Sequence, residues 1–165
     1  TRRSSDLTEL YHVASYLELE QARFEEKLVV ELDVEDDLNC KVPSFILQPL
    51  VENAVRHGGD RTGARHVSIS AHSVEGMAEI AVADRGQGIP REVVLGLYTG
   101  QGKGVGLSNV HKRLKSIYGE DNGLKIETSE AGSRVWFRIP LEPEEIPGPI
   151  HETKQEESYN EDSCD

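Results

Sequence analysis

Apolar side chains near the start of the chain recur at helical spacing. The steps between them alternate between three and four residues, along Leu7, Leu10, Ala14, Leu17, Gln21 and Phe24. Gln21 is the polar interruption of this heptad-like stripe, which predicts an amphipathic helix from about residue 6 to 25. The same pattern fits a helix packed on its own domain and the end of a longer dimerising helix.

The next segments predict a strand and a second helix. Residues 27–34 alternate, with one apolar face made of Leu28, Val30, Leu32 and Val34. Residues 43–57 then place apolar side chains at helical spacing, and Gly58 and Gly59 are expected to end that helix. Pro49 lies inside it, where we expect a kink or a delay in the regular hydrogen bonding.

Two hairpins and a third helix are predicted in the rest of the domain. Residues 66–72 and 78–84 alternate around one turn, and residues 124–129 and 134–141 alternate around another. Residues 89–106 are rich in glycine and lack a clear period, so we expect a mobile loop there. The helix that follows ends at Gly119, and its predicted apolar stripe is Leu107, Val110, Leu114 and Ile117.

This order of elements predicts an α+β fold. Hairpins with helices between them favour a two-layer sandwich, in which helices cover one face of a mixed, mostly antiparallel sheet behind a leading helix. We expect the end of a dimerisation or linker helix over residues 1–26, a compact domain over 27–141 and an acidic, disordered tail over 142–165. The tail carries nine acidic residues and one Lys, so disorder is expected from about residue 143.

Charge and cysteine content narrow the possible partners. The formal net charge is −12, most of it in the tail, and the sequence lacks the clustered basic residues that nucleic acid requires. Cys40 and Cys164 lie far apart, so reduced thiols in a cytoplasmic setting are expected. The sequence has no apolar stretch near the ~18 residues of a membrane span. It begins without Met and resembles a piece of a longer protein.

The first candidate motif is "LVENAVRHG", residues 50–58. On a helix, Asn53 shares one face with Arg56 and His57, which follow three and four residues later. An amide oxygen can ligate Mg²⁺, and the two basic side chains can donate hydrogen bonds to phosphate oxygens. Taken alone, the segment also fits the polar face of an ordinary amphipathic helix.

The second candidate motif is "DRGQGIP", residues 84–90. Asp84 has the parity of Ile80 and Val82, so its carboxylate should point toward the apolar side of the strand. That placement is costly without a hydrogen-bond donor, and the exocyclic amine of adenine would supply one. Gly86 and Gly88 would remove side chains where a flat base lies against the backbone. A simple Asp-Gly turn is the alternative.

The third candidate motif is "GQGKGVGLSNV", residues 100–110, whose glycines lead into a helix beginning near Leu107. Free N–H groups and the dipole at a helix start favour phosphate, and Lys103 would add a positive charge. The motif is not a Walker loop, because Gly104 follows the Lys, and it lacks the spacing of a dinucleotide-binding fingerprint. A flexible loop without a ligand is the alternative.

Together these motifs resemble the N, G1 and G2 boxes of the Bergerat-fold ATPases, the superfamily of histidine kinases, gyrase, MutL and a heat-shock chaperone. The resemblance covers residues 43–141. "LQPLVENAVRHG", "GVGLSNVHKRL" and, in the first helix, "YLELEQARF" are especially similar to sensor histidine kinases of the LytS type. The resemblance implies a Bergerat-type (GHKL, HATPase_c) domain with protein histidine kinase activity. Such a domain uses ATP and Mg²⁺ to phosphorylate a histidine, which here would lie upstream of this chain.

The resemblance also implies roles for individual residues. Asn53 would hold Mg²⁺, Arg56 and His57 would face the phosphates, and Glu52 would polarise the accepting histidine or a water molecule. Asp84 would bind the adenine amine, and the residues around the nucleotide base would be Gly86, Gly88, Ile89 and Ser133. The hinge and phosphate-binding end of an ATP lid would comprise Lys103, Gly104, Val105, Gly106, Leu107 and Ser108.

Some positions depart from the family pattern. Pro49 stands where gyrase-like ATPases place a water-activating Glu, so hydrolysis by that route is not expected. Arg85 replaces the usual Asn, and the lid, about 91–103, is short and lacks a clear aromatic box. His12 lacks the "NPHFLFN"-like motif around the family's phospho-accepting histidine.

The resemblance implies partners outside this chain. They are the upstream dimerisation and phospho-acceptor domain, a response regulator and a second copy in the full-length homodimer, which we expect to be membrane-anchored. An anti-sigma-type serine kinase of the same superfamily and a non-catalytic nucleotide-binding or docking module are the alternative functions.

Overall fold

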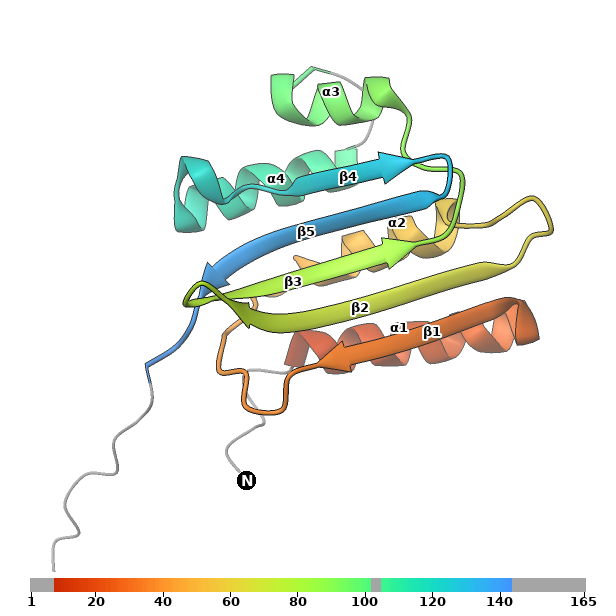
Figure 1. The fold of residues 1–165 in the computed structure, drawn as a ribbon, viewed down its shortest axis with the longest axis horizontal. Coiled ribbons are helices and arrows are strands. Elements are labelled where there is room, and N and C mark those ends of the chain that lie inside the picture. The colour runs from red at the N-terminus through yellow and green to blue at the C-terminus, as the bar shows by residue number, and fades with distance from the viewer. Residues whose placement is uncertain (1–7, 102–104, 144–165) are drawn as a thin grey trace, which may run out of the picture.

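The computed structural model describes residues 8–101 and 105–143 of the chain. Its elements follow the predicted order except for one additional helix (Figure 1). Short 3-10 helices lie at Glu25–Lys27 and Glu120–Asn122. The other elements are α1 (Thr8–Phe24), β1 (Leu28–Val34), α2 (Leu47–His57), β2 (Arg65–Val74), β3 (Met77–Asp84), α3 (Arg91–Thr99), α4 (Val105–Tyr118), β4 (Lys125–Ser129) and β5 (Gly132–Pro140).

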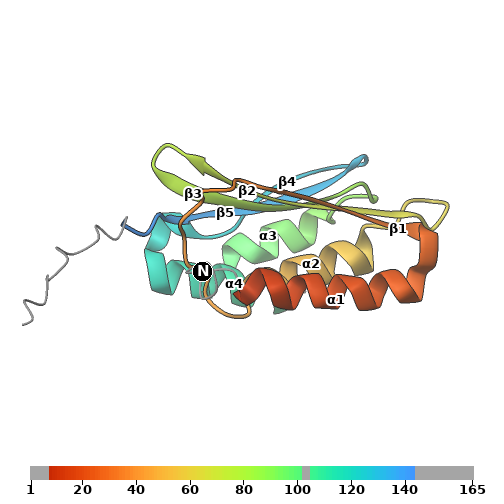
Figure 2. The same ribbon diagram turned by 90° about the horizontal axis from the view of Figure 1, so that it is seen from below.

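The strands form one five-stranded sheet with the order β1-β2-β3-β5-β4. The β1–β2 pair is parallel, whereas β2–β3, β3–β5 and β4–β5 are antiparallel. Helices α1, α2, α3 and α4 lie on one face of the sheet (Figure 2). This arrangement confirms the predicted two-layer α+β fold with its mixed, mostly antiparallel sheet.

The core lies between the sheet and the helices. Alternate residues of β2, β3 and β5 point toward the helices, as the period of two requires. Ile69, Ile80 and Phe137 are among the fully buried side chains on the sheet side. They belong to the same core as Leu50 of α2 and Leu114 of α4, so the core fixes both helices against the sheet.

The leading helix α1 packs against α2 of the same chain. Val13 and Leu17 are buried, and α1 lies beside α2 (Figure 2). The buried face is therefore centred on Val13, which the predicted stripe missed, and Gln21 is exposed. Tyr11 and Leu19, on the outer side of α1, are 64% and 72% exposed.

The prediction of an irregular loop over residues 89–106 was wrong, because α3 occupies Arg91–Thr99. Val93 and Leu97 have helical spacing, and Leu97 is buried. Gly96 in the middle and the glycines on either side obscured this short period. Gly100, with a φ of 72°, ends the helix in the left-handed conformation that glycine adopts readily.

Pro49 lies in the first turn of α2, because the helix begins only at Leu47, as the expected delay in regular hydrogen bonding allows. It is the third residue of the helix, where a backbone N–H would lack an intrahelical acceptor. The missing donor therefore costs no helical hydrogen bond at this position.

Two apolar side chains are more exposed than their patterns predict. Leu32 is 61% exposed because β1 is an edge strand, and Ile117 is 48% exposed because Tyr118 packs against the core in its place. The predicted disorder of the tail falls on residues 144–165, outside the described part of the chain. Within the described residues, no helix has the length and apolar character needed to cross a membrane.

Candidate functional site

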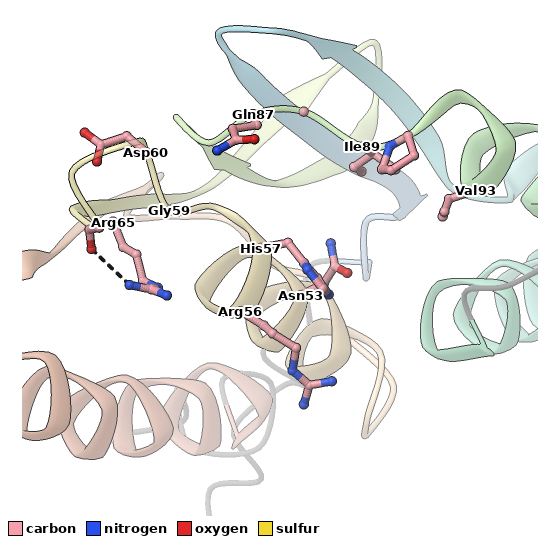
Figure 3. Close-up of a pocket in the computed structure, with 12 residues that line it drawn as sticks. Asn53, Arg56, His57, Gly59, Asp60, Arg65, Gln87, Ile89 and Val93 are labelled. Atoms are coloured by element: carbon pink, nitrogen blue, oxygen red, sulfur yellow. Dashed lines mark hydrogen bonds between the residues drawn. The ribbon is translucent and has the colours of Figure 1, made fainter.

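The C-terminal half of α2 forms one wall of a cavity of about 610 Å³. Asn53 and His57 lie on this wall with Arg56, opposite the loop after β3 and the start of α3 (Figure 3). Gly88 and Ile89 line the opposite side. The structure thus brings the first and second sequence motifs to one cavity, whose volume is in the range of small-molecule sites.

A second cavity, of about 320 Å³, adjoins the first along α2. Glu52 lines it, as do Gly106 and Leu107 from the first turn of α4. Both cavities share Asn53, Arg56, His57 and Val93, and we call the combined space the α2 cleft. All three sequence motifs therefore contribute residues to the α2 cleft.

Asp84 lies at the end of β3, beside the C-terminal end of α2. Its Oδ1 accepts a hydrogen bond of 2.8 Å from the Gly86 N–H. Burial raises the pKa of this carboxyl group, and hydrogen bonds from the Gly86 and Ser133 backbones and the nearby His57 oppose the shift. Asp84 therefore carries a desolvation cost, as its inward parity predicted.

Asp84 does not line the α2 cleft in this structure. Together with Thr128 and Ser133 it lines a shallower hollow of about 380 Å³. The two regions are close, because a Cβ placed on Gly58 would lie 2.7 Å from the Cβ of Asp84. The structure thus places Asp84 and Ser133 on a surface beside the α2 cleft, whereas Gly88 and Ile89 line the cleft itself.

Gly86 and Gly88 are required where the chain crosses its own backbone. A Cβ on Gly86 would lie 2.6 Å from the Gly58 Cα, and one on Gly88 would lie 2.3 Å from the Ser129 carbonyl oxygen. Gly88 also has a φ of 84°. These glycines hold residues 84–89 between the end of α2 and the β4–β5 turn, a reason that the sequence analysis did not identify.

Thr128 joins the loop after β3 to the last two strands. Its Oγ1 accepts a hydrogen bond of 2.7 Å from the Ile89 N–H and lies 3.0 Å from the Ser133 Oγ. Ser133 is only 5% exposed. Sequence reasoning missed Thr128, although its place on β4 directly opposite Ser133 of β5 follows from the short predicted turn.

The loop between α2 and β2 forms the outer wall of the α2 cleft. Asp60 accepts hydrogen bonds from the Thr62 hydroxyl and from the Thr62 and Ala64 N–H groups. The Thr62 hydroxyl, followed by the Thr62 N–H, chiefly lowers the pKa of the Asp60 carboxyl group. Arg65 donates from Nε to the Val55 carbonyl oxygen at 2.7 Å. Both Asp60 and Arg65 line the cleft, and the sequence analysis missed them. The two-residue step from Asp60 to Thr62 was the available signal, since it is typical of an Asx turn.

The predicted phosphate-binding loop is described only in part. Lys103 and Gly104 lie outside the described residues, and of Val105 only the backbone is described, as the first residue of α4. Gly106 is exposed, Leu107 is buried, and Ser108 is half-buried. The start of α4 therefore lies at the α2 cleft, as the third motif predicted.

The donor set of the α2 cleft fits Mg²⁺ bound together with a phosphate ligand. Across residues 8–101 and 105–143, no cluster of three or more His, Cys, Asp or Glu side chains could hold a metal ion. Asn53 instead offers one amide oxygen on the cleft wall. Mg²⁺ typically takes few protein ligands and completes its shell with water and substrate phosphates.

Comparison with known proteins identifies the family. Residues 43–143 match the sequence profile described as histidine kinase-, DNA gyrase B- and HSP90-like ATPase. The chain belongs to this ATPase family. The match covers all three motifs, and it confirms the family that they predicted.

Curated members of the family are similar over most of the chain. The sensor histidine kinase YpdA of Escherichia coli is 42% identical over 135 residues, which are 80% of this chain and 24% of YpdA. The sensor protein LytS of Enterococcus faecalis is 38% identical over 151 residues, 87% of this chain and 26% of LytS. These matches confirm the resemblance to LytS-type kinases. The chain spans about a quarter of the length of these relatives.

Solved structures show the same fold. The catalytic domain of histidine kinase ThkA superposes with a TM-score of 0.66 at 22% identity, over 82% of this chain and 93% of that domain. The histidine kinase domain from Erythrobacter litoralis EL346 superposes with a TM-score of 0.61 at 20% identity, over 80% and 63% of the two chains. The fold is that of a histidine kinase catalytic domain, as the predicted Bergerat-type class requires.

Proposed function

We propose that this chain is the ATP-binding catalytic domain of a LytS-type sensor kinase and transfers the γ-phosphoryl group of ATP to a histidine outside the chain. The observation that carries the proposal is the α2 cleft. There Asn53, Arg56 and His57 face Ile89 and the first turn of α4. Family membership and the match to sensor kinases support ATP as the substrate.

Each wall of the site takes a separate part of the nucleotide. Asp84 accepts a hydrogen bond from the adenine amine, and Ser133 and Ile89 border the base. Arg56, His57 and the N–H groups at the start of α4 bind phosphate oxygens. Asn53 would hold Mg²⁺, which would supply positive charge next to the phosphates. Because phosphoryl transfer requires little covalent chemistry from the protein, positioning and charge neutralisation supply most of the catalysis.

Glu52 and Pro49 favour transfer to a protein over transfer to water. Pro49 lines the cleft where related ATPases have a water-activating carboxylate, and it offers no proton acceptor. Glu52 also lines the cleft, and its Oε1 accepts a hydrogen bond of 2.9 Å from the Gln48 Nε2. This bond orients the carboxylate, which can then polarise the accepting histidine of an incoming domain.

The remaining partners follow from the relatives. The matched proteins are called sensors, and the match covers only about a quarter of their length, which leaves room for a dimerisation and phospho-acceptor domain. We infer a homodimeric parent protein that is membrane-anchored, with this domain in the cytoplasm. The phosphohistidine then donates its phosphoryl group to an aspartate of a response regulator.

The test is phosphoryl transfer from γ-labelled ATP to the histidine domain of a LytS relative supplied in trans. We expect Mg²⁺-dependent labelling that is lost in acid and stable in base, as a phosphohistidine is. Acid-stable label on a serine peptide, with none on the histidine domain, would instead identify a serine kinase. An absence of ATP binding would identify a docking module and contradict the proposal.

A further inference from the structure

Glu9, in the first turn of α1, is a buried carboxylate that the proposed reaction does not use. It is 4% exposed, and its Oε1 accepts a hydrogen bond of 3.3 Å from the backbone N–H of Gln48. Gln48 is the second residue of α2 and lies 39 positions further along the chain. A carboxylate on α1 therefore occupies the N-terminal end of the helix that carries the phosphate-binding residues.

The start of α2 lacks a capping residue of its own. Its N-cap is Ile46, whose side chain has no hydrogen-bond acceptor, and Pro49 has no N–H. The amide of the second helical residue is one that an N-cap side chain normally satisfies. Glu9 takes this role from a different helix, and its negative charge also matches the positive end of the α2 dipole.

The other end of α2 is also connected to α1. The Arg65 Nε donates to the Val55 carbonyl oxygen near the end of α2, and the Arg65 guanidinium lies 4.2 Å from the ring centre of Phe24, the last residue of α1. Between these ends, burial raises the pKa of Tyr16, and the charges of Glu20 and Glu52 raise it further. Helix α1 therefore borders α2 from its N-terminus to its C-terminus.

We propose that Glu9 is a positioning residue that fixes α2, and with it Asn53 and Arg56, relative to the residues that bind the base. The inference rests on the proposed function, since it concerns the binding of Mg²⁺ and phosphates by α2. Glu9 is buried and lines neither of the two cavities that make up the α2 cleft. Its loss lets α2 shift, so it weakens the phosphate and Mg²⁺ contacts and leaves the adenine contacts of Asp84 intact.

The experiment measures ATP affinity by calorimetry with Mg²⁺ and with EDTA, in the wild-type chain, Glu9→Ala and Glu9→Gln. The gain is the ratio of the ATP affinity with Mg²⁺ to the ATP affinity in EDTA. We expect this ratio to be about fivefold smaller in Glu9→Ala than in the wild-type chain, which is the size of a typical N-cap contribution. The affinity in EDTA should not change. Glu9→Gln should recover most of the gain, because its amide oxygen can still accept the Gln48 N–H. Should Glu9→Ala not fold, Glu9→Asp, which is one methylene shorter, must show the same selective loss.

Glu79→Gln is the matched control for a general loss of stability. Glu79 pairs with Arg134 at 2.7 Å and Arg138 at 2.9 Å on β5, and its parity in β3 points it away from the helices. This variant should be less stable than the wild-type chain and should keep the full gain in ATP affinity that Mg²⁺ provides. An unchanged gain in Glu9→Ala, or an equal loss in Glu79→Gln, would overturn the role of Glu9. A wild-type chain that does not bind ATP would instead contradict the proposed function itself.

Discussion

Gly86→Ala tests whether the loop after β3 is aligned by its contact with the end of α2. The new Cβ would lie 2.6 Å from the Gly58 Cα, 2.8 Å from the Gly58 carbonyl carbon and 2.9 Å from the His57 carbonyl oxygen. Nonbonded carbon atoms normally lie about 3.5–4.0 Å apart, so the two segments must separate by about 1 Å. All three neighbours are backbone atoms, and none can move by a rotamer change.

Overpacking of this kind lowers the free energy of unfolding by about 2 kcal/mol, which lowers Tm by roughly 4–8 °C in a domain of this size. The displacement also moves Asp84 and Ile89 away from α2, so ATP affinity should fall by at least about tenfold. Thermal unfolding and calorimetric titration measure the two effects.

Gly59→Ala is the matched control for Gly86→Ala, because its Cβ would lie no closer than 3.5 Å to the Arg65 side chain. It should unfold within about 2 °C of the wild-type Tm. A Gly86→Ala chain with an unchanged Tm, or with a lower Tm and an unchanged ATP affinity, would refute the argument.

Three further variants test the stability of the site and the core. Burial raises the pKa of Asp84 above its ordinary value of 3.8, so the ionised form of this side chain opposes folding. As pH rises from about 3.8 through the pKa of the folded protein, the wild-type chain should therefore lose stability relative to Asp84→Asn. Urea unfolding at several pH values checks this, and a constant difference between the two proteins would contradict it. Thr128→Val removes the acceptor of the Ile89 N–H and the partner of Ser133, so the free energy of unfolding measured with urea should fall by about 1 kcal/mol. An unchanged free energy would show that these hydrogen bonds contribute nothing to stability. Phe137→Ala deletes a fully buried ring of β5 and should cost about 3–5 kcal/mol in the same assay, and a cost below about 1 kcal/mol would mean that the core is misassigned.

The strands and the three motifs could be predicted because their signals are local. The alternation of residues 66–72 and 78–84 gave both strands and the inward direction of Asp84. Helix α3 was missed because Gly96 interrupts a stripe of only two apolar positions in a nine-residue helix. Its anchor, the contact of the Tyr98 ring with His111 at 5.5 Å, joins residues of different helices.

Contacts between distant segments could not be read from the sequence. Glu9 has the pattern of a solvated helix residue, and its acceptor role depends on the start of α2. Gly86 resembled a residue that leaves room for a ligand, yet the neighbour that requires glycine is Gly58. In both cases the partner lies far along the chain, and only the packing of α2 against the sheet and α1 brings the two together.

The most direct measurement of the central claim is a calorimetric titration of ATP with Mg²⁺ into the wild-type chain and Asp84→Asn. The account predicts saturable binding at one site in the wild-type chain. It also predicts no measurable binding in the variant, because the carboxylate that accepts the adenine amine is gone. Equal affinities would contradict the assignment of Asp84 to the base, and the absence of binding to the wild-type chain would contradict the ATP site as a whole.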